Sequence, residues 1–265
     1  MNRIFSNLPS EASMKSQAAL LRRSGQGAPY AATAPFEIIE VDLDGPREGE
    51  VLVRVTAAGV CHSDLSVLNG SRPRPLPLIG GHEATGIVEA LGSGVSNLIE
   101  GDHVSLVFMP SCRECNECRN GIPAFCSIGS AANVKGELIR GGTRISYKGE
   151  KINHYNGVSC YSQYAIMDER SLVKIPSDLP KEIAAIFGCA LLTGIGAVRQ
   201  IIYPWKWIVA AKLVVDPLQS AFFFTRISAW TFVLSCSQKT TRRTGTLLSN
   251  GGKPPQYLRG LRTTL

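Results

Sequence analysis

The sequence lacks both a long apolar run and an apolar N-terminal segment, and these absences limit where the protein can act. The most apolar region, residues 201–236, is interrupted by charged side chains. It therefore falls short of the roughly 18 uninterrupted apolar residues that a membrane-spanning helix needs. The residues before Met14 are polar and lack the apolar core of a secretory signal. A cytoplasmic protein with no membrane partner is predicted.

Acidic residues are nearly lacking from the last quarter of the chain. Residues 199–265 hold ten Lys and Arg against one acid, Asp216, a net charge of +9, whereas residues 1–198 carry −2. This shift in composition predicts two segments of different character. A basic segment is one requirement for binding nucleic acid. A basic tail without a nucleic-acid partner is the favoured interpretation, and nucleic-acid binding is the alternative.

Short β-rich segments fill most of residues 14–198 and end in a helical segment. The alternation of Val51, Val53 and Val55 with other residues is typical of a half-buried strand. Strands are predicted over residues 17–21, 36–41, 50–58, 86–90, 102–108, 161–167 and 172–175, with a helix over 180–198. A mainly β, barrel-like domain with helices (the α+β class) is therefore expected. Residues 1–13 are predicted to be an N-terminal extension.

Four of the eight cysteines form a compact motif with the spacing C-x2-C-x2-C-x7-C: Cys112, Cys115, Cys118 and Cys126. Zinc takes four ligands in a tetrahedron, and such short steps in a loop place neighbouring thiolates around one ion. Because all four ligands would be protein side chains, the site would be closed and structural. An iron–sulfur cluster and chance clustering are the alternatives. The C-x2-C-x2-C-x3-C-P pattern of bacterial ferredoxins does not match the last gap.

Three further motifs surround this loop in the sequence: Cys61 in G-V-C-H-S-D, His82 in G-G-H-E, and Cys189 in G-C-A-L-L-T-G. Each is weak alone, since a single cysteine is more often a small core residue than a ligand. Together, in this order and around the four-cysteine loop, they resemble the zinc-dependent alcohol dehydrogenases of the medium-chain dehydrogenase/reductase family. Residues 161–175 and 187–198 are most similar to the class III-like branch of that family.

The resemblance implies a GroES-like, partly open β-barrel catalytic domain over residues 14–198 that holds two zinc ions. Cys61, His82 and Cys189 would bind the catalytic zinc and leave a fourth position open, while the four-cysteine loop would bind the structural zinc. The open position would take the oxygen of a small alcohol or aldehyde. Zinc would stabilise the alkoxide from which a hydride passes to NAD. Members of the family form homo-oligomers, which is the expected partnership.

The resemblance also assigns roles to residues beside the catalytic zinc. Asp64 would orient His82, and Glu83 would be a carboxylate near the zinc that can ligate it transiently. Ser63 would pass the substrate proton outward, and its alternative role is that of a turn-capping serine. Ser66 stands in the region where many relatives carry a histidine that completes the proton relay. Proton release would then need another route.

Residues for NAD are the part of the resemblance that the sequence does not supply. His62 and Thr193 would face the pyrophosphate and the nicotinamide. A strand leading into a G-x-G-x-x-G turn, which cradles the pyrophosphate, is lacking, because residues 92–97 and 194–199 both fail at the third glycine.

Residues 199–265 are therefore expected to be an unrelated, irregular and poorly ordered basic tail in place of the NAD-binding Rossmann domain. The chain as written would be a truncated and inactive member of an NAD-linked lineage that oxidises alcohols or reduces aldehydes. A non-catalytic zinc-binding module or decoy subunit is the alternative.

Overall fold

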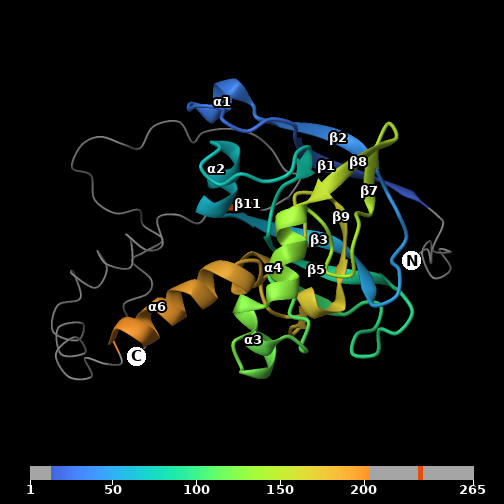
Figure 1. Ribbon diagram of the computed structural model, residues 1–265. Coiled ribbons are helices and arrows are strands. Elements are labelled where there is room, and N and C mark those ends of the chain that lie inside the picture. Colours follow the sequence, from blue (N-terminus) through green and yellow to red (C-terminus); the bar gives the residue numbers. More distant parts are fainter. Residues whose placement is uncertain (1–12, 203–231, 235–265) are drawn as a thin grey trace.

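Two β-sheets form the body of the computed structural model, which describes residues 13–202 and 232–234 (Figure 1). The first sheet is a closed barrel in the order β1-β2-β7-β8-β4. Its strands are β1 (Met14–Leu21), β2 (Phe36–Leu43), β4 (Leu78–Ile79), β7 (Ile145–Tyr147) and β8 (Glu150–His154). β1 pairs with β2 over its whole length and with β4 at its C-terminal end, and the β4–β8 pair completes the ring.

The second sheet has the order β10-β6-β5-β3-β11, with β9 also paired to β3. Its strands are β3 (Glu50–Val60), β5 (Glu83–Leu91), β6 (His103–Leu106), β9 (Tyr164–Asp168), β10 (Leu172–Lys174) and β11 (Phe232–Leu234). β9 pairs with residues 50–54 of β3 and β11 with residues 58–60, while β5 takes the other side of β3. β11 thus covers the edge of β3 just before Cys61.

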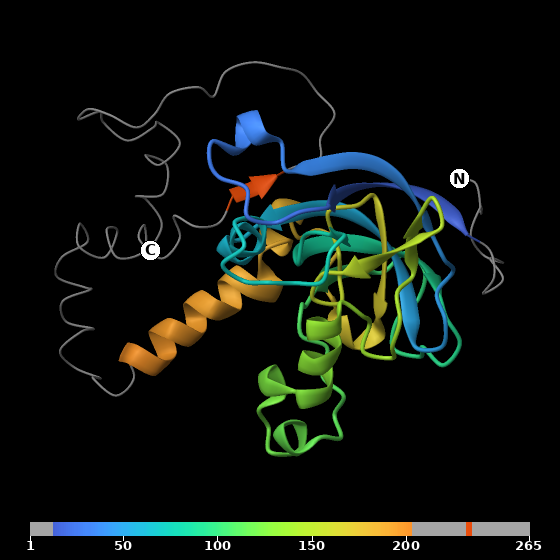
Figure 2. The same ribbon diagram turned by 45° about the horizontal axis from the view of Figure 1, so that its top comes forward.

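Short helices join the strands. They are α1 (Tyr30–Thr33), α2 (His62–Leu68), α3 (Asn116–Arg119), η1 (Pro123–Phe125), α4 (Ser127–Lys135), η2 (Glu169–Ser171), α5 (Lys181–Ala184), the π-helical turn η3 (Phe187–Leu191) and α6 (Leu192–Ile202). Figures 1 and 2 show that α6 extends away from the sheets, which leaves Leu192 and Ile195 58% and 55% exposed. Every helix in the described ranges is too short or too polar to cross a bilayer.

Strand β3 lies between two hydrophobic cores. Val51 and Val53 face one core and Leu52 faces the other, and all three side chains are buried. Successive side chains of a strand point to opposite faces, so this part of β3 is covered on both sides. The prediction of a half-buried strand was therefore wrong for residues 51–53. Because Cys61 follows β3 directly, a fully packed strand carries the first predicted metal ligand.

The predicted strands are confirmed with small shifts at their ends, and the mainly β fold with helices is confirmed. The predicted helix over residues 180–198 is instead interrupted, since α5 ends at Ala184 and η3 separates it from α6. The barrel, expected to be partly open, is closed. The expectations for residues 1–13 and 199–265 lie mostly outside the described residues.

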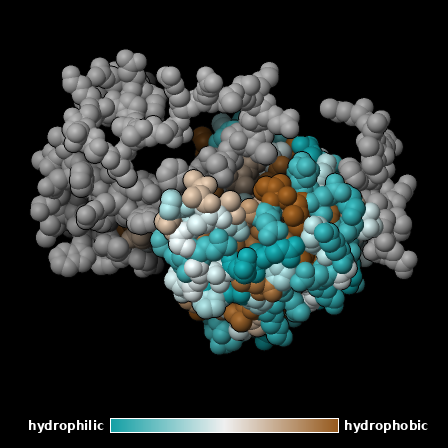
Figure 3. All heavy atoms as spheres, turned by 90° about the horizontal axis from the view of Figure 1, so that it is seen from above, coloured by the Kyte–Doolittle hydropathy of each residue, from teal (hydrophilic) through white to brown (hydrophobic). Residues whose placement is uncertain are grey.

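The described surface is mixed in character. In the view of Figure 3, hydrophilic residues dominate and hydrophobic ones are exposed in small groups between them. Ile38 on β2 and Phe125 in η1 are the most exposed large apolar side chains among those described, at 72% and 74%. Scattered exposure of this kind is ordinary for a folded domain.

Candidate functional site

Three separate elements bring Cys61, His82 and Cys189 together. Cys61 follows β3, His82 directly precedes β5, and Cys189 lies in η3. Their ligand atoms all lie within 4.8 Å of one another. His82 and Cys189 are buried and Cys61 is half-buried. The fold thus brings three side chains that are far apart in the sequence into one compact set of possible metal ligands.

The first turn of α2 ties two of these residues together. Cys61 is the N-cap of α2, and its backbone N–H donates to Asp64 Oδ2 at 2.9 Å. The second oxygen of Asp64, Oδ1, lies 3.1 Å from His82 Nδ1. A carboxylate three residues after the N-cap is a usual way to satisfy an unpaired backbone N–H at a helix start. Here the same carboxylate also fixes the imidazole, so that Nε2 is left to face Cys61 and Cys189.

The backbone before His82 turns through a conformation that requires glycine. Gly81 has φ +87°, and a Cβ atom there would lie 2.4 Å from the ring of Tyr161. The imidazole of His82 is then held between two aromatic rings, Phe108 and Tyr155, with centroids 5.5 and 5.6 Å away and both edge-to-face. Such contacts restrict the ring of His82 to one orientation.

Close packing of η3 against β6 positions Cys189. A Cβ atom on Gly188 would lie 1.8 Å from the carbonyl oxygen of Leu106, so only glycine allows this approach. The backbone N–H of Ala190, the residue after Cys189 in η3, donates to Glu83 Oε1 at 2.8 Å. Glu83 Oε2 is buried and has no hydrogen-bond partner in the described part of the chain. A buried carboxylate oxygen without a partner is costly, and a cation beside it removes that cost.

The charges in this site influence one another. A hydrogen bond from Cys189, opposed by burial and aided by His82, lowers the pKa of Cys61 to about 3. Burial lowers the pKa of His82, but the hydrogen bonds to Asp64 and Cys61 outweigh it and raise that pKa to about 10. Burial, followed by the Cys61 thiolate, raises the pKa of Glu83.

The donors of this site are two thiol sulfurs and an imidazole, with a carboxylate adjacent. They are the ligands that zinc prefers, and three protein ligands are typical of a zinc site with an open position. The thiolate character of Cys61 and the unpaired oxygen of Glu83 both favour a cation at the centre. The residues therefore fit a zinc ion.

The four-cysteine loop forms a second donor set. The sulfurs of Cys112, Cys115, Cys118 and Cys126 lie within 4.8 Å of one another, and none is in a disulfide. Backbone N–H groups of Cys112 and Gly129 each point at the Cys126 sulfur at 3.3 Å. Such donors stabilise a thiolate, the form that ligates zinc. Four sulfurs complete a tetrahedral shell, so this set fits a closed zinc site.

The other predicted site residues lie outside the ligand sets. Ser63 is half-buried on α2, and its backbone carbonyl accepts a hydrogen bond from Tyr155 Oη at 3.1 Å. His62 is exposed on the same helix, and its Nδ1 lies 3.4 Å from Ser66 Oγ. Thr193 is exposed on α6. The structure thus groups Ser63, His62 and Ser66 at the start of α2.

Sequence reasoning missed the aromatic residues around His82. Phe108 follows β6 and Tyr155 follows β8, so neither is near His82 in the sequence. No motif marks either residue, because ring packing has no fixed spacing along the chain. Only the closure of the barrel and its packing against the second sheet bring Tyr155 beside His82.

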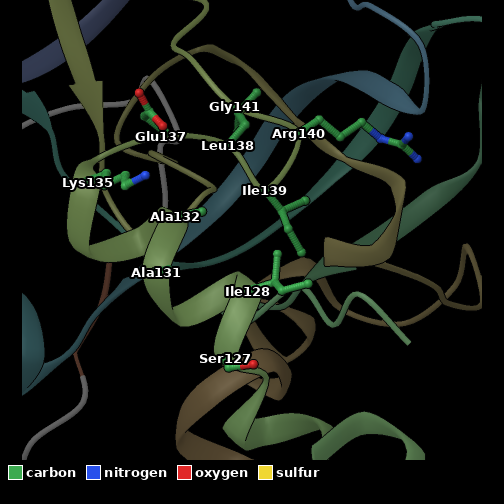
Figure 4. A pocket seen from close by; sticks show the side chains of 10 residues that line it. All are labelled: Ser127, Ile128, Ala131, Ala132, Lys135, Glu137, Leu138, Ile139, Arg140 and Gly141. Carbon is green, nitrogen blue, oxygen red and sulfur yellow. The ribbon is translucent and has the colours of Figure 1, made fainter. Parts of the chain in front are cut away.

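A surface pocket lies elsewhere, at α4 and the segment that follows it (Figure 4). It is lined by Ser127, Ile128, Ala131, Ala132, Lys135, Glu137, Leu138, Ile139, Arg140 and Gly141. None of the seven predicted cysteine and histidine ligands lines it. Arg140 turns its guanidinium group to Asp168 at 2.8 Å. This pocket is therefore separate from both proposed metal sites.

Comparisons with known proteins agree with this geometry. Residues 47–177 match the family described as alcohol dehydrogenase GroES-like domain. An S-(hydroxymethyl)glutathione dehydrogenase of Escherichia coli O1:K1 / APEC is 40% identical over 188 residues, which are 71% of this chain and 49% of that protein. The chain thus spans about half the length of the curated relatives it matches.

Solved structures give the same result. A zinc-binding domain protein of the alcohol dehydrogenases from Burkholderia ambifaria superposes with a TM-score of 0.65 and 36% identity, over 72% of this chain and 50% of that one. Benzyl alcohol dehydrogenase from Acinetobacter calcoaceticus superposes with a TM-score of 0.62 and 34% identity, over 71% and 49%.

Proposed function

We propose that this chain, whose residues 47–177 match the family described as alcohol dehydrogenase GroES-like domain, binds an alcohol or aldehyde at a zinc ion held by Cys61, His82 and Cys189. The observation that carries the proposal is the convergence of these three donors within 4.8 Å from three different elements. A bound zinc ion acts there as a Lewis acid that polarises the substrate oxygen. The four-cysteine loop is proposed to hold a second, structural zinc.

The neighbouring residues support this chemistry through their own contacts. The Asp64 carboxylate, 3.1 Å from His82 Nδ1, favours a proton on that nitrogen and would leave Nε2 to ligate the metal. Glu83 accepts the Ala190 N–H with one oxygen, and its other oxygen, which has no hydrogen-bond partner among the described residues, would be available to a bound metal ion. The rings of Phe108 and Tyr155 pack edge-to-face with the imidazole of His82 and hold its orientation.

A proton route is proposed along the start of α2. The Ser63 hydroxyl would accept the proton of the substrate alcohol. The next polar groups on this helix are His62 and Ser66, whose Nδ1 and Oγ atoms lie 3.4 Å apart. His62 is exposed, so a proton that reaches it can pass to solvent. The His62–Ser66 pair would thus be an alternative route for the proton, since Ser66 stands in the region where many relatives carry a histidine.

NAD is proposed as the hydride acceptor of the lineage, with His62 and Thr193 facing it. The expectation that the 265 residues alone do not reduce NAD stays a prediction. Absorbance of NADH during incubation with a primary alcohol tests it. Alcohol-dependent formation of NADH that is lost in Cys61→Ala would contradict that expectation.

Metal content tests the proposed zinc sites directly. The purified full chain is expected to contain two zinc ions per chain, one for each donor set, measured by mass spectrometry of dissolved metal. Cys61→Ser should remove one of them and Cys112→Ser the other. Cys160→Ser is the matched control, because Cys160 is buried outside both sets. Full zinc content in Cys61→Ser would contradict the catalytic assignment.

Substrate binding needs a second readout. Cobalt in place of the Cys61–His82–Cys189 zinc gives a visible absorption band that changes when its ligands change. Addition of a primary alcohol is expected to shift this band in the wild-type chain. A band that stays unchanged at saturating alcohol would favour a non-catalytic zinc module.

A further inference from the structure

One face of α4 follows the segment that leads from β6 into the four-cysteine loop, residues 108–112. Cys126 at the N-cap, Gly129 and Asn133 are spaced along the helix so that they lie on the same face. Each of them contacts residues 108–112, and the contacts run in opposite directions along the two segments. Figures 1 and 2 show α4 running from α3 toward the strands. A single helix face is thus packed along the whole segment.

The first of these contacts involve a predicted ligand of the four-cysteine loop. The backbone N–H groups of Cys112 and Gly129 both donate to Cys126 Sγ at 3.3 Å. A Cβ atom on Gly129 would lie 2.3 Å from the Pro110 carbonyl oxygen, so only glycine permits this close approach of the helix. The two N–H groups stabilise the thiolate form of Cys126, which is the form that binds zinc. The position of α4 is therefore tied to the four-cysteine site.

Asn133 makes the last contact, at the other end of the segment. Its side chain is 4% exposed, and its Nδ2 donates to the Phe108 carbonyl at 3.1 Å. Its Oδ1 is buried without a hydrogen-bond partner among the described residues, 3.4 Å from the place that a Cβ atom on Gly157 would take. A buried amide with one unpaired oxygen costs free energy that an apolar side chain would not. The contact with Phe108 is thus made at a cost to the stability of the fold.

Phe108 connects this contact to a predicted metal ligand. Its ring packs against the imidazole of His82 with the centroids 5.5 Å apart and the planes at 84°. Tyr155 packs against the same imidazole at 5.6 Å, and Gly157, which Asn133 faces, follows it by two residues. Edge-to-face contacts depend on the angle between the two rings. A displaced Phe108 backbone would therefore change the orientation of His82.

We propose that Asn133 is a positioning residue for His82, and that α4 thereby couples metal binding at the four-cysteine loop to metal affinity at the Cys61–His82–Cys189 site. The inference rests on the proposed function, because it requires metal at both donor sets. Asn133 is not a ligand, and it acts through the carbonyl and the ring of Phe108. Ligation of all four cysteines would hold α4 and residues 108–112 together, and so would fix the backbone on which that ring stands.

The test uses the full chain with zinc in the four-cysteine loop and cobalt at the Cys61–His82–Cys189 site. Asn133→Leu keeps the branched shape of the side chain and removes its amide. It should shift the cobalt absorption band and weaken cobalt binding about three- to tenfold, less than the roughly 10- to 100-fold effect of a direct partner of a ligand. Competition with a chromophoric chelator measures the affinity. The melting temperature should stay close to that of the wild type.

Two single variants accompany this measurement. Asn133→Gln keeps an amide donor at the same position and should restore part of the band position and of the affinity. Asn120→Leu is the matched control, because it makes the same substitution at an exposed asparagine beside the four-cysteine loop. The Asn120 amide bonds to Asn116 and does not contact residues 108–112. Asn120→Leu should leave the cobalt band and the affinity unchanged.

Two double variants trace the coupling. Phe108→Leu removes the ring beside His82, so adding Asn133→Leu to it should weaken cobalt binding no further. Cys118→Ser removes one predicted ligand of the four-cysteine loop and should weaken cobalt binding at the other site about two- to tenfold. In the Asn133→Leu background the same change should have little effect. A thermal melt of each variant verifies that it is folded.

The outcomes separate this inference from the proposed function. If the wild-type chain binds cobalt at the Cys61–His82–Cys189 site but Asn133→Leu behaves like Asn120→Leu, the inference is overturned and the proposed function stands. A lower melting temperature of Asn133→Leu with an unchanged band would assign Asn133 to the stability of the fold, which also overturns it. Additive losses in either double variant would show that the effect bypasses Phe108 or α4, and would overturn the coupling. If the wild-type chain takes up no cobalt at this site, the proposed function fails and the inference fails with it.

Discussion

Asp64 contacts two of the proposed metal ligands although it is not a proposed ligand itself. One carboxylate accepts the Cys61 backbone N–H at 2.9 Å and lies 3.1 Å from His82 Nδ1, so it couples two donors from different elements. It is buried, and its charge is therefore poorly screened by solvent. A change at this residue should disturb the metal site without removing a ligand.

Asp64→Asn is expected to reduce zinc affinity at the Cys61–His82–Cys189 site by about 10- to 100-fold. The amide keeps the shape of the side chain but loses the charge that orients the imidazole of His82. Competition with a chromophoric chelator measures the affinity. Ser66→Ala is the control on the same helix, since the hydrogen bonds of its hydroxyl to described residues are with His62, and zinc affinity should not change. Unaltered affinity in Asp64→Asn would show that the ligands are held without this carboxylate.

At the scale of single elements, two glycines offer a matched comparison. Gly188 lies in η3, where an added Cβ would approach the Leu106 carbonyl oxygen to 1.8 Å, and Gly196 lies in α6, where nothing is within 4 Å. Gly188→Ala is expected to displace η3 from β6, and thereby to lower the melting temperature and the zinc content together. Gly196→Ala should stabilise by up to about 1 kcal/mol, since alanine favours helix. Thermal melts and metal analysis of both variants provide the measurement. Equal behaviour would mean that η3 can shift without cost.

The elements also show what the sequence could and could not predict. Alternating valines and glycine-bounded apolar runs were sufficient for the strands, because each is a local pattern. The π-helical turn at residues 187–191 was not foreseen, and it packs Gly188 on Leu106, a contact between distant segments that no local pattern predicts. The short strands β4, β7 and β8 were missed for a related reason. They are polar or brief, and their partners in the closed barrel define them.

The residues of the candidate site also divide into those that the sequence could predict and those that it could not. The four cysteines could be proposed as ligands from their spacing, and Cys61, His82 and Cys189 from the family resemblance. The fold brings these predicted ligands together in two sets. Tyr155 could not be placed beside them, because its contact with His82 depends on how the segment after β8 packs. Local chemistry is therefore visible in the sequence, whereas the packing around the ligands depends on tertiary structure.

For the whole molecule, a buried ion pair joins the second sheet to the barrel. Glu50 begins β3, and its carboxylate accepts from Arg144 Nε at 2.8 Å and Nη2 at 2.5 Å, just before β7. Both side chains are buried. Glu50→Gln should lower the free energy of unfolding by about 3–5 kcal/mol, because it leaves the charge of Arg144 uncompensated.

Urea denaturation measures this effect, and a double variant is the control. Glu50→Gln combined with Arg144→Met should recover part of the loss, because no unpaired charge is then buried. If the double variant loses as much stability as the two single variants added together, the coupling energy between Glu50 and Arg144 is zero, which would contradict a stabilising ion pair. Equal stability of Glu50→Gln and wild type would mean that solvent reaches Arg144.

His154 should make the stability of the whole fold depend on pH. It is buried at the end of β8, and its Nε2 accepts from the Arg144 backbone N–H at 3.3 Å. Burial, with the charge of Arg144, lowers its pKa to about 3, whereas an unfolded histidine titrates near 6.5. The unfolded state therefore binds more protons below about pH 6.5. The stability that neutral His154 allows is complete above that pH and is lost as the pH falls toward 3.

His154→Gln should accordingly flatten the fall of the unfolding free energy between about pH 6.5 and pH 4. Glutamine can still accept the Arg144 N–H, and it has no proton to gain. Urea denaturation at a series of pH values gives the slope for both proteins. The cysteines and carboxylates titrate equally in wild type and His154→Gln. The difference between the slopes of unfolding free energy against pH therefore isolates His154. Parallel slopes would mean that His154 becomes protonated within the folded protein, and its burial against Arg144 would then have to open near neutral pH.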